Sequence, residues 1–145
     1  MAKTAKQVQG DIYEMLKKSH LATQLSGEVY RGTPRSNYRP RDSRKEDAIV
    51  IFTAGKPGQI QTGVVTINIF VPDIDPYDNG VLVENGERTA EVESLAQEWV
   101  DDIIANNYFY DFELSDTIYT EAEPSINQHF VVVKLKYKLS ELYNQ

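Results

Sequence analysis

Histidines are the first side chains to weigh for chemistry, because imidazole exchanges protons near neutral pH and binds transition metals. The chain has two, His20 and His129, and no cysteine. A serine hydrolase needs a converging serine, histidine and carboxylate, but Ser19 and His20 are adjacent and no GxSxG motif is present. Neither histidine belongs to a metal-ligand pattern such as HExxH. We interpret both as surface or helix-capping residues and predict no catalytic residue and no metal site.

Acidic residues cluster at Asp73, Asp75 and Asp78, just before Asn79-Gly80. A calcium-binding EF-hand loop places oxygen ligands at positions 1, 3 and 5 and glycine at position 6. Counted from Asp73, position 5 is Tyr77 and position 6 is Asp78, so the spacing does not fit. We interpret this segment as a solvated turn. No P-loop and no GxGxxG motif is present, so we predict no cofactor.

The basic residues gather in one segment, residues 31–45 (RGTPRSNYRPRDSRK). Six basic residues against one acid give this segment a charge of +5. The whole chain has a net charge of −7, so the residues outside the segment carry −12. Arginine and tyrosine are frequent at binding hot spots, and both contact single-stranded nucleic acid. Three interpretations stay open, namely a solvated loop, a protein interface and a nucleic-acid site. The residues concerned are Arg31, Arg35, Tyr38, Arg39, Arg41 and Arg44.

Two amphipathic helices are expected to support these segments. The first covers about residues 5–19, and Thr4 and Gln7 have the spacing of a capping box. The second covers about residues 90–106, with Thr89 as its N-cap. Its apolar residues recur every 3.6 positions and predict one buried stripe, made of Val92, Leu95, Ala96, Trp99, Val100, Ile103 and Ile104.

Strands are predicted from β-branched and alternating segments. A short strand covers residues 28–30, and a hairpin joins residues 47–53 to residues 59–71. Two further strands cover residues 108–119 and 127–139. In the first of these, Tyr108, Tyr110 and Phe112 fall on one face by period. One of the two faces must point away from the core, and its aromatic residues are available for an interface. Long irregular segments cover residues 31–46 and 72–88.

This element order predicts an α+β fold in one domain, residues 1–145. We expect an antiparallel sheet of about four to five strands, with the two helices packed on one face, in the order α-β-β-β-α-β-β. The longest unbroken apolar run has five residues, Ala48 to Phe52, so no transmembrane helix is expected.

The arrangement of these segments resembles the tail-completion and tail-terminator proteins of long-tailed bacteriophages and prophages, which act where the head joins the tail. The resemblance covers nearly the whole chain. It starts with an amphipathic helix that ends in HLATQL, a short strand and a long loop. The strand DAIVIFTAG, the strand GVVTINIFVPD, the helix TAEVESLAQEWVDDIIANN and a closing strand HFVVVKLKYKL follow.

The resemblance implies a structural protein without enzyme activity, present in the host cytoplasm during assembly and then in the virion. It implies a homo-oligomeric ring, typically a hexamer, whose partners are tail-tube and head-connector proteins and not a membrane. DNA would only pass through the ring, and an acidic lumen would repel it. The proposed interface then comprises Arg31, Arg35, Tyr38, Arg39, Arg41, Arg44, Tyr108 and Tyr110. The alternative is a small nucleic-acid-binding module that uses the arginine-rich segment.

Overall fold

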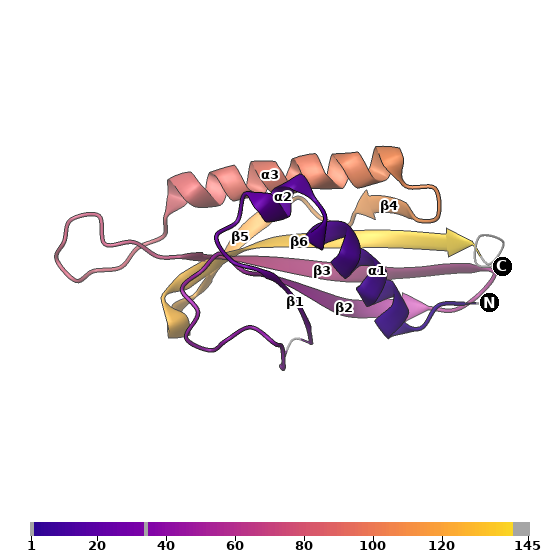
Figure 1. Cartoon of the computed structure of the whole chain (residues 1–145), viewed down its shortest axis with the longest axis horizontal. Coiled ribbons are helices and arrows are strands. Elements are labelled where there is room, and N and C mark those ends of the chain that lie inside the picture. Colours follow the sequence, from indigo (N-terminus) through magenta and orange to yellow (C-terminus); the bar gives the residue numbers. More distant parts are fainter. Residues whose placement is uncertain (1, 34, 141–145) are drawn as a thin grey trace.

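The computed structural model describes residues 2–33 and 35–140, and it has the predicted α+β fold (Figure 1). Residues with strong apolar periodicity form its elements. Along the chain these are α1 (Ala5–Lys17), α2 (His20–Thr23), β1 (Val29–Gly32), β2 (Ala48–Lys56), β3 (Ile60–Pro72), α3 (Gly86–Asn106), β4 (Asp111–Leu114), β5 (Tyr119–Glu123), the 3-10 helix η1 (Pro124–Ile126) and β6 (Gln128–Ser140).

The described residues form a six-stranded sheet in the order β1-β2-β3-β6-β4, and β5 also pairs with β6. Strands β2, β3 and β6 are antiparallel, and the centre of the sheet pairs Val50 with Ile67 and Ile67 with Val133. Strands β4 and β5 pair with opposite ends of β6, so they follow one another along its outer edge.

The expected all-antiparallel sheet is wrong, because β1 pairs parallel to β2. Val29 lies beside Ala48 and Gly32 lies beside Ile51, so both strands run in the same direction. A parallel neighbour requires a connection that returns the chain to the starting end of the sheet. Residues 33–47 make that return, which accounts for the length of the loop between the two strands.

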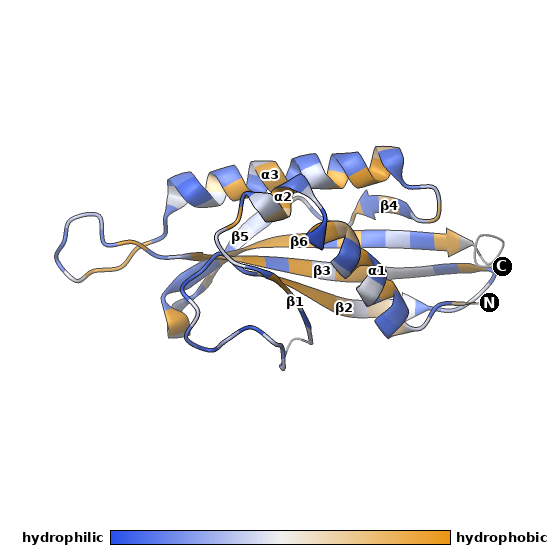
Figure 2. Ribbon diagram, viewed as in Figure 1, coloured by the Kyte–Doolittle hydropathy of each residue, from blue (hydrophilic) through white to orange (hydrophobic). Residues whose placement is uncertain are grey.

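All three helices lie on one face of the sheet, as Figure 1 shows. One core cluster joins Ile12 of α1, Val100 of α3, Val50 of β2, Ile67 of β3 and Val133 of β6. Apolar side chains of the sheet and helices form this cluster between the two layers. In Figure 2, hydrophilic and hydrophobic residues alternate along α3, as in a helix with one buried side. The predicted placement of the helices is therefore confirmed, although short α2 adds a third.

The predicted helix start is right for α1, which ends two residues earlier than expected, at Lys17, and the predicted start is wrong for α3. Thr4 and Gln7 form the expected capping box: the Gln7 backbone N–H donates to Thr4 Oγ1 and the Thr4 N–H donates to Gln7 Oε1. Helix α3 begins at Gly86, four residues earlier than predicted, because Asn85 Oδ1 accepts the N–H of Arg88 and caps the helix. Thr89 lies inside the helix, where its hydroxyl donates to Glu84.

The predicted strand over residues 108–119 is also wrong, because it divides into β4 and β5. Residues 115–118 separate them. Tyr108 and Phe109 precede β4 and lie in the loop after α3. The predicted stripe of α3 packs on the sheet except for Ile104, which is 45% exposed near the end of the helix. The end of α3 and the following loop thus present apolar side chains to solvent.

Candidate assembly surfaces

The arginine-rich segment, residues 31–46, is called the basic loop from here on. Its middle part, at Arg39, lies against Phe70 on the face of the sheet opposite the helices, whereas Arg31 at its start belongs to β1 and contacts Tyr13 of α1. Its anchor is Arg39, whose Nε lies 2.8 Å from Asp47 Oδ2; the two side chains are 6% and 1% exposed. The guanidinium also lies 4.1 Å from the ring centre of Phe70 on β3. Arg39 thus ties the loop to the open face of the sheet.

A buried hydrogen-bond network surrounds this ion pair. Arg39 Nη2 donates to Gln128 Oε1 at 2.8 Å and to the Lys45 carbonyl oxygen at 3.1 Å. Gln128 in turn donates to the carbonyl oxygen of Ser43, and the Ser43 hydroxyl donates to Asp47 Oδ2. Burying an ion pair is favourable only when such bonds satisfy its remaining donors and acceptors. The network therefore holds the loop against the starts of β2 and β6.

The interface role predicted for Arg39 is wrong, since its charge is neutralised and buried within its own chain. Two of the other arginines also contact their own chain while staying exposed. The Arg31 guanidinium lies 4.8 Å from the ring centre of Tyr13, and Arg44 donates to the Ile126 carbonyl oxygen at 3.0 Å. Arg35, Tyr38 and Arg41 are exposed, with Tyr38 at 80%. These three residues leave the outer part of the loop basic and accessible.

The aromatic residues that follow α3 separate into a buried and an exposed pair. Tyr110 and Phe112 stack in the core with ring centres 5.1 Å apart, whereas Tyr108 is 88% and Phe109 61% exposed. The Tyr110 hydroxyl donates to Asp11 Oδ2 at 2.6 Å. The interface role predicted for Tyr110 is therefore wrong, because Tyr108 and Tyr110 do not share a face. Tyr108 remains a surface candidate.

Burial raises the pKa of Tyr110 above its ordinary value, and the hydrogen bond to Asp11 raises this pKa further. The folded chain therefore retains a proton that an unfolded tyrosine releases near pH 10, so this contribution to stability falls as the pH rises above about 10. We expect Tyr110→Phe to cost about 1–3 kcal/mol at pH 8 and progressively less above pH 10. Denaturant unfolding across this pH range measures the difference. Exposed Tyr108→Phe is the control, and a Tyr110→Phe cost that does not change with pH would contradict the assignment.

An open cleft of about 380 Å³ lies at the end of the molecule where α3 ends. We call it the end cleft. Its apolar walls come from Ile60 at the start of β3, Ile104 of α3 and the exposed pair Tyr108 and Phe109. Lys138 and Asp111 add charges to its lining. The sequence analysis missed Ile60 and Ile104, because it assigned the first to a strand and the second to the buried stripe of α3.

Residues 73–85 extend from the other end of the molecule as a narrow loop, called the arm from here on (Figure 1). Reciprocal backbone hydrogen bonds of 2.9 Å join Ile74 and Val83 across it. Its base is fixed by His129, whose Nδ1 lies 2.7 Å from Asp73 Oδ1. Asp75 Oδ1 and Oδ2 accept the N–H groups of Asn79 and Gly80, which supports the turn prediction for this aspartate.

The arm is richer in apolar surface than a solvated turn requires. Its exposed apolar residues are Ile74, Tyr77, Val81, Leu82 and Val83, with exposures between 39% and 84%. Figure 2 shows hydrophobic segments in the arm, away from the layer between helices and sheet. Three of these residues, Val81, Leu82 and Val83, are adjacent in the sequence between the Asn-Gly pairs at 79–80 and 85–86.

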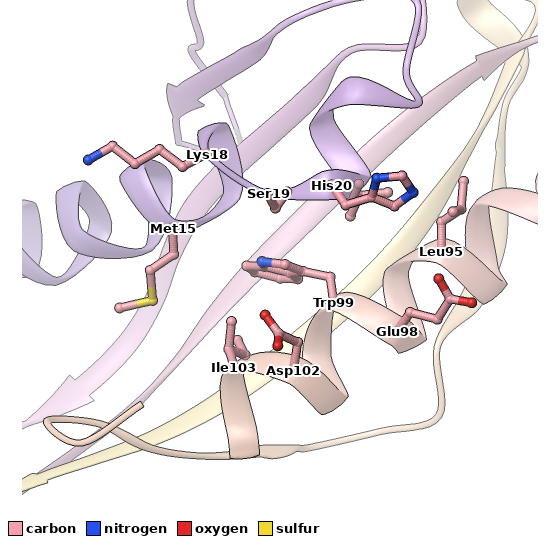
Figure 3. A pocket seen from close by; sticks show the side chains of 10 residues that line it. Met15, Lys18, Ser19, His20, Leu95, Glu98, Trp99, Asp102 and Ile103 are labelled. Carbon is pink, nitrogen blue, oxygen red and sulfur yellow. The ribbon is translucent and has the colours of Figure 1, made fainter. Parts of the chain in front are cut away.

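A second cleft, of about 380 Å³, lies between α3 and the corner of α1 and α2 (Figure 3). Trp99 forms its floor, and the indole Nε1 is buried without a hydrogen-bond partner among the described residues. His20, Glu98 and Asp102 border it, but no hydrogen bond joins these three side chains within the part of the chain that the structure describes. In residues 2–33 and 35–140, no three histidine or acidic side chains are grouped as metal ligands would be. No described helix is both long and apolar enough to cross a membrane.

The sequence matches no protein-family model, and a search of curated proteins finds no match.

Proposed function

We propose that the protein is a structural component of the head–tail junction of a long-tailed phage or prophage, without a catalytic role. In this proposal, copies of the chain form a ring that caps the tail tube and joins it to the head connector. The observation that carries the proposal is the presence of two exposed apolar surfaces at opposite ends of the molecule, the arm and the end cleft. The resemblance of the sequence to tail-completion proteins supplies the setting.

The positions of the two surfaces support repeated association. Ten large apolar side chains are exposed among the described residues, and nine belong to the arm or to the end cleft; Tyr38 is the tenth. Contiguous exposed apolar surface often marks a site of protein association. Two different surfaces on one chain permit a head-to-tail contact, which produces a closed ring when the rotation between neighbours closes on itself.

The charge distribution is compatible with the same function. Outside residues 31–45 the chain carries −12, and a ring with an acidic lumen repels the phosphates of passing DNA. The basic loop would then lie at contacts between subunits or with an acidic partner, away from the DNA path. Arg35 and Arg41 are the exposed cations that such a contact would use.

The test combines light scattering over a concentration series, negative-stain microscopy and tail tubes assembled from a tail-tube protein. We expect closed rings of about six copies with a central hole, either in solution or only at tube ends. Labelled chain should bind at tube ends and not along the tube. A chain that forms no ring and does not bind tube ends would contradict the proposal.

One observation favours a second candidate, a single-stranded nucleic-acid module. Tyr38 is 80% exposed and lies between the exposed Arg35 and Arg41, which is a combination that stacks bases and binds phosphates. This candidate predicts DNA binding that weakens steeply with added salt and is lost in Tyr38→Ala. The ring proposal predicts instead that the chain binds tail-tube ends in the absence of any nucleic acid.

A further inference from the structure

We infer that the contact between neighbouring copies is made by the arm of one copy inserted into the end cleft of the next. This inference rests on the proposed function only in requiring that copies of the chain associate. It assigns Tyr77, Val81 and Leu82 of the arm as the inserted side chains, and Ile60 and Tyr108 as part of the receiving wall. Each chain then provides one arm and one cleft.

The length of the molecule prevents the arm from reaching its own cleft. Strand β3 has thirteen residues, beginning with Ile60 in the cleft and ending at Pro72 beside the arm, which at about 3.4 Å per residue is roughly 40 Å. Helix α3 runs from the arm back to the cleft and has 21 residues, or about 30 Å. Both elements hold the two surfaces apart, so any contact between them joins different molecules.

The shapes of the two surfaces are complementary. The arm projects from the body (Figure 1), and its large apolar side chains are exposed. The end cleft is hollow, and the aromatic rings of Tyr108 and Phe109 lie open to solvent beside Ile60 and Ile104. Inserting the arm would remove apolar surface from water on both partners, which is the main favourable term in most protein associations.

The charges of the two surfaces also agree. The arm contains Asp73, Asp75, Asp78 and Glu84 and no basic residue. Lys138 lines the cleft, and it forms no ion pair among the described residues, whereas Lys134 and Lys136 of the same strand pair with Asp116 and Glu113. Asp73 is occupied by His129 and Asp75 by backbone N–H groups, so exposed Asp78 is the carboxylate best placed to meet Lys138. Such a pair would orient the arm more than it would strengthen binding.

Single substitutions on exposed residues test the contact without altering the core. We expect Tyr77→Asp in the arm and Tyr108→Asp in the cleft each to raise the dissociation constant for self-association at least about tenfold. Thr23→Asp is the control, because Thr23 is exposed on α2 and lies outside the arm, the end cleft and the basic loop; its dissociation constant should equal that of the unmodified chain. Sedimentation over a concentration series gives all three values. Wild-type association in either the arm or the cleft variant would overturn the inference.

Mixing the two variants distinguishes this contact from a symmetric one. The Tyr77→Asp chain keeps an intact cleft and the Tyr108→Asp chain keeps an intact arm, so the mixture should form dimers that grow no further. If instead two arms met each other, the cleft variant alone would associate normally, and the inference would be wrong.

The absence of cysteine from the sequence makes disulfide trapping specific. Chains with Val81→Cys mixed with chains with Tyr108→Cys should form a mixed disulfide dimer on oxidation, and Thr23→Cys with Tyr108→Cys should not. If the first pair forms no more disulfide dimer than the second, the inference is overturned. This test also applies if the chain is monomeric in dilute solution, because the disulfide traps short-lived contacts. Rings that persist in Tyr77→Asp would overturn the arm contact alone. Trapped open chains that never close and never bind tail tubes would contradict the proposed function alone.

Discussion

Replacing Arg39 by methionine should lower the free energy of unfolding by about 3–5 kcal/mol, because it leaves the Asp47 carboxylate buried without its counter-charge. The Asp47 side chain is 1% exposed. It would retain the Ser43 hydroxyl and the Glu28 N–H as donors, but neither carries a charge. The change also removes Arg39 Nη2, which donates hydrogen bonds to both Gln128 Oε1 and the Lys45 carbonyl oxygen. The denaturant midpoint, at unchanged slope, measures the loss.

The basic loop contains its own control for this prediction. Arg41→Met removes the same charge from an exposed position in the same loop, and we expect a change within about 0.5 kcal/mol. Arg39→Met combined with Asp47→Asn should recover part of the stability, since no net charge then remains buried. Equal midpoints for Arg39→Met and Arg41→Met would show that the loop is held by its overall charge and not by this ion pair.

A consequence for assembly follows from the anchor. The Arg39 network joins residues that lie 89 positions apart in the chain, Arg39 and Gln128. Loss of the anchor would release Arg35, Tyr38 and Arg41 from a fixed position on the sheet. If the outer part of the basic loop binds a partner, Arg39→Met should therefore weaken that binding even though Arg39 itself is buried.

Local periodicity was sufficient to predict the layers of the fold. The alternation over Val65, Ile67, Ile69 and Val71 places these side chains in the core, and the 3.6-residue stripe of α3 packs on the sheet from Val92 to Ile103. Both signals arise from residues within one element. The α+β class and the single helical layer follow from them without knowledge of long-range pairing.

Features set by distant residues could not be predicted in this way. The parallel pairing of β1 depends on where residues 33–47 return the chain, and no local pattern encodes that path. Asn85 and Thr89 both have the residue type of an N-cap, and the folded chain uses Asn85, while the Thr89 hydroxyl donates to Glu84. The chain has six arginines, and the sequence alone does not show which of them is buried. Arg39 is buried because it contacts Asp47, Phe70 and Gln128, and these three residues meet only in the folded chain.

The candidate surfaces were predicted only in part, for a related reason. Exposure of Tyr108 was expected within an aromatic cluster, but its strand pattern wrongly placed Tyr110 on the same face. The arm was interpreted as a turn, because apolar residues that project from the body have no periodic partner in the sequence. An exposed apolar residue and a buried one look the same in the sequence when the element that carries them is short.

The second large effect is expected at Trp99, the one tryptophan of the chain. The ring is 5% exposed and packs in the core from α3, while one edge faces the cleft beside α1 and α2 (Figure 3). We expect Trp99→Ala to lower the free energy of unfolding by about 3–5 kcal/mol. The lower part of this range is favoured, because water from the open cleft can enter part of the space that the ring leaves.

Trp99→Phe separates packing from hydrogen bonding at this position. The indole Nε1 has no hydrogen-bond partner among the described residues, so phenylalanine removes no bond and should cost less than half as much as alanine. Ile104→Ala on the exposed side of the same helix is the control, with an expected change within about 0.5 kcal/mol. Because fluorescence is lost with the tryptophan, circular dichroism gives the midpoints. If Trp99→Phe costs as much as Trp99→Ala, packing of the ring does not account for the stability that Trp99 provides. The indole N–H would then donate a hydrogen bond to a polar group in the cleft between the helices.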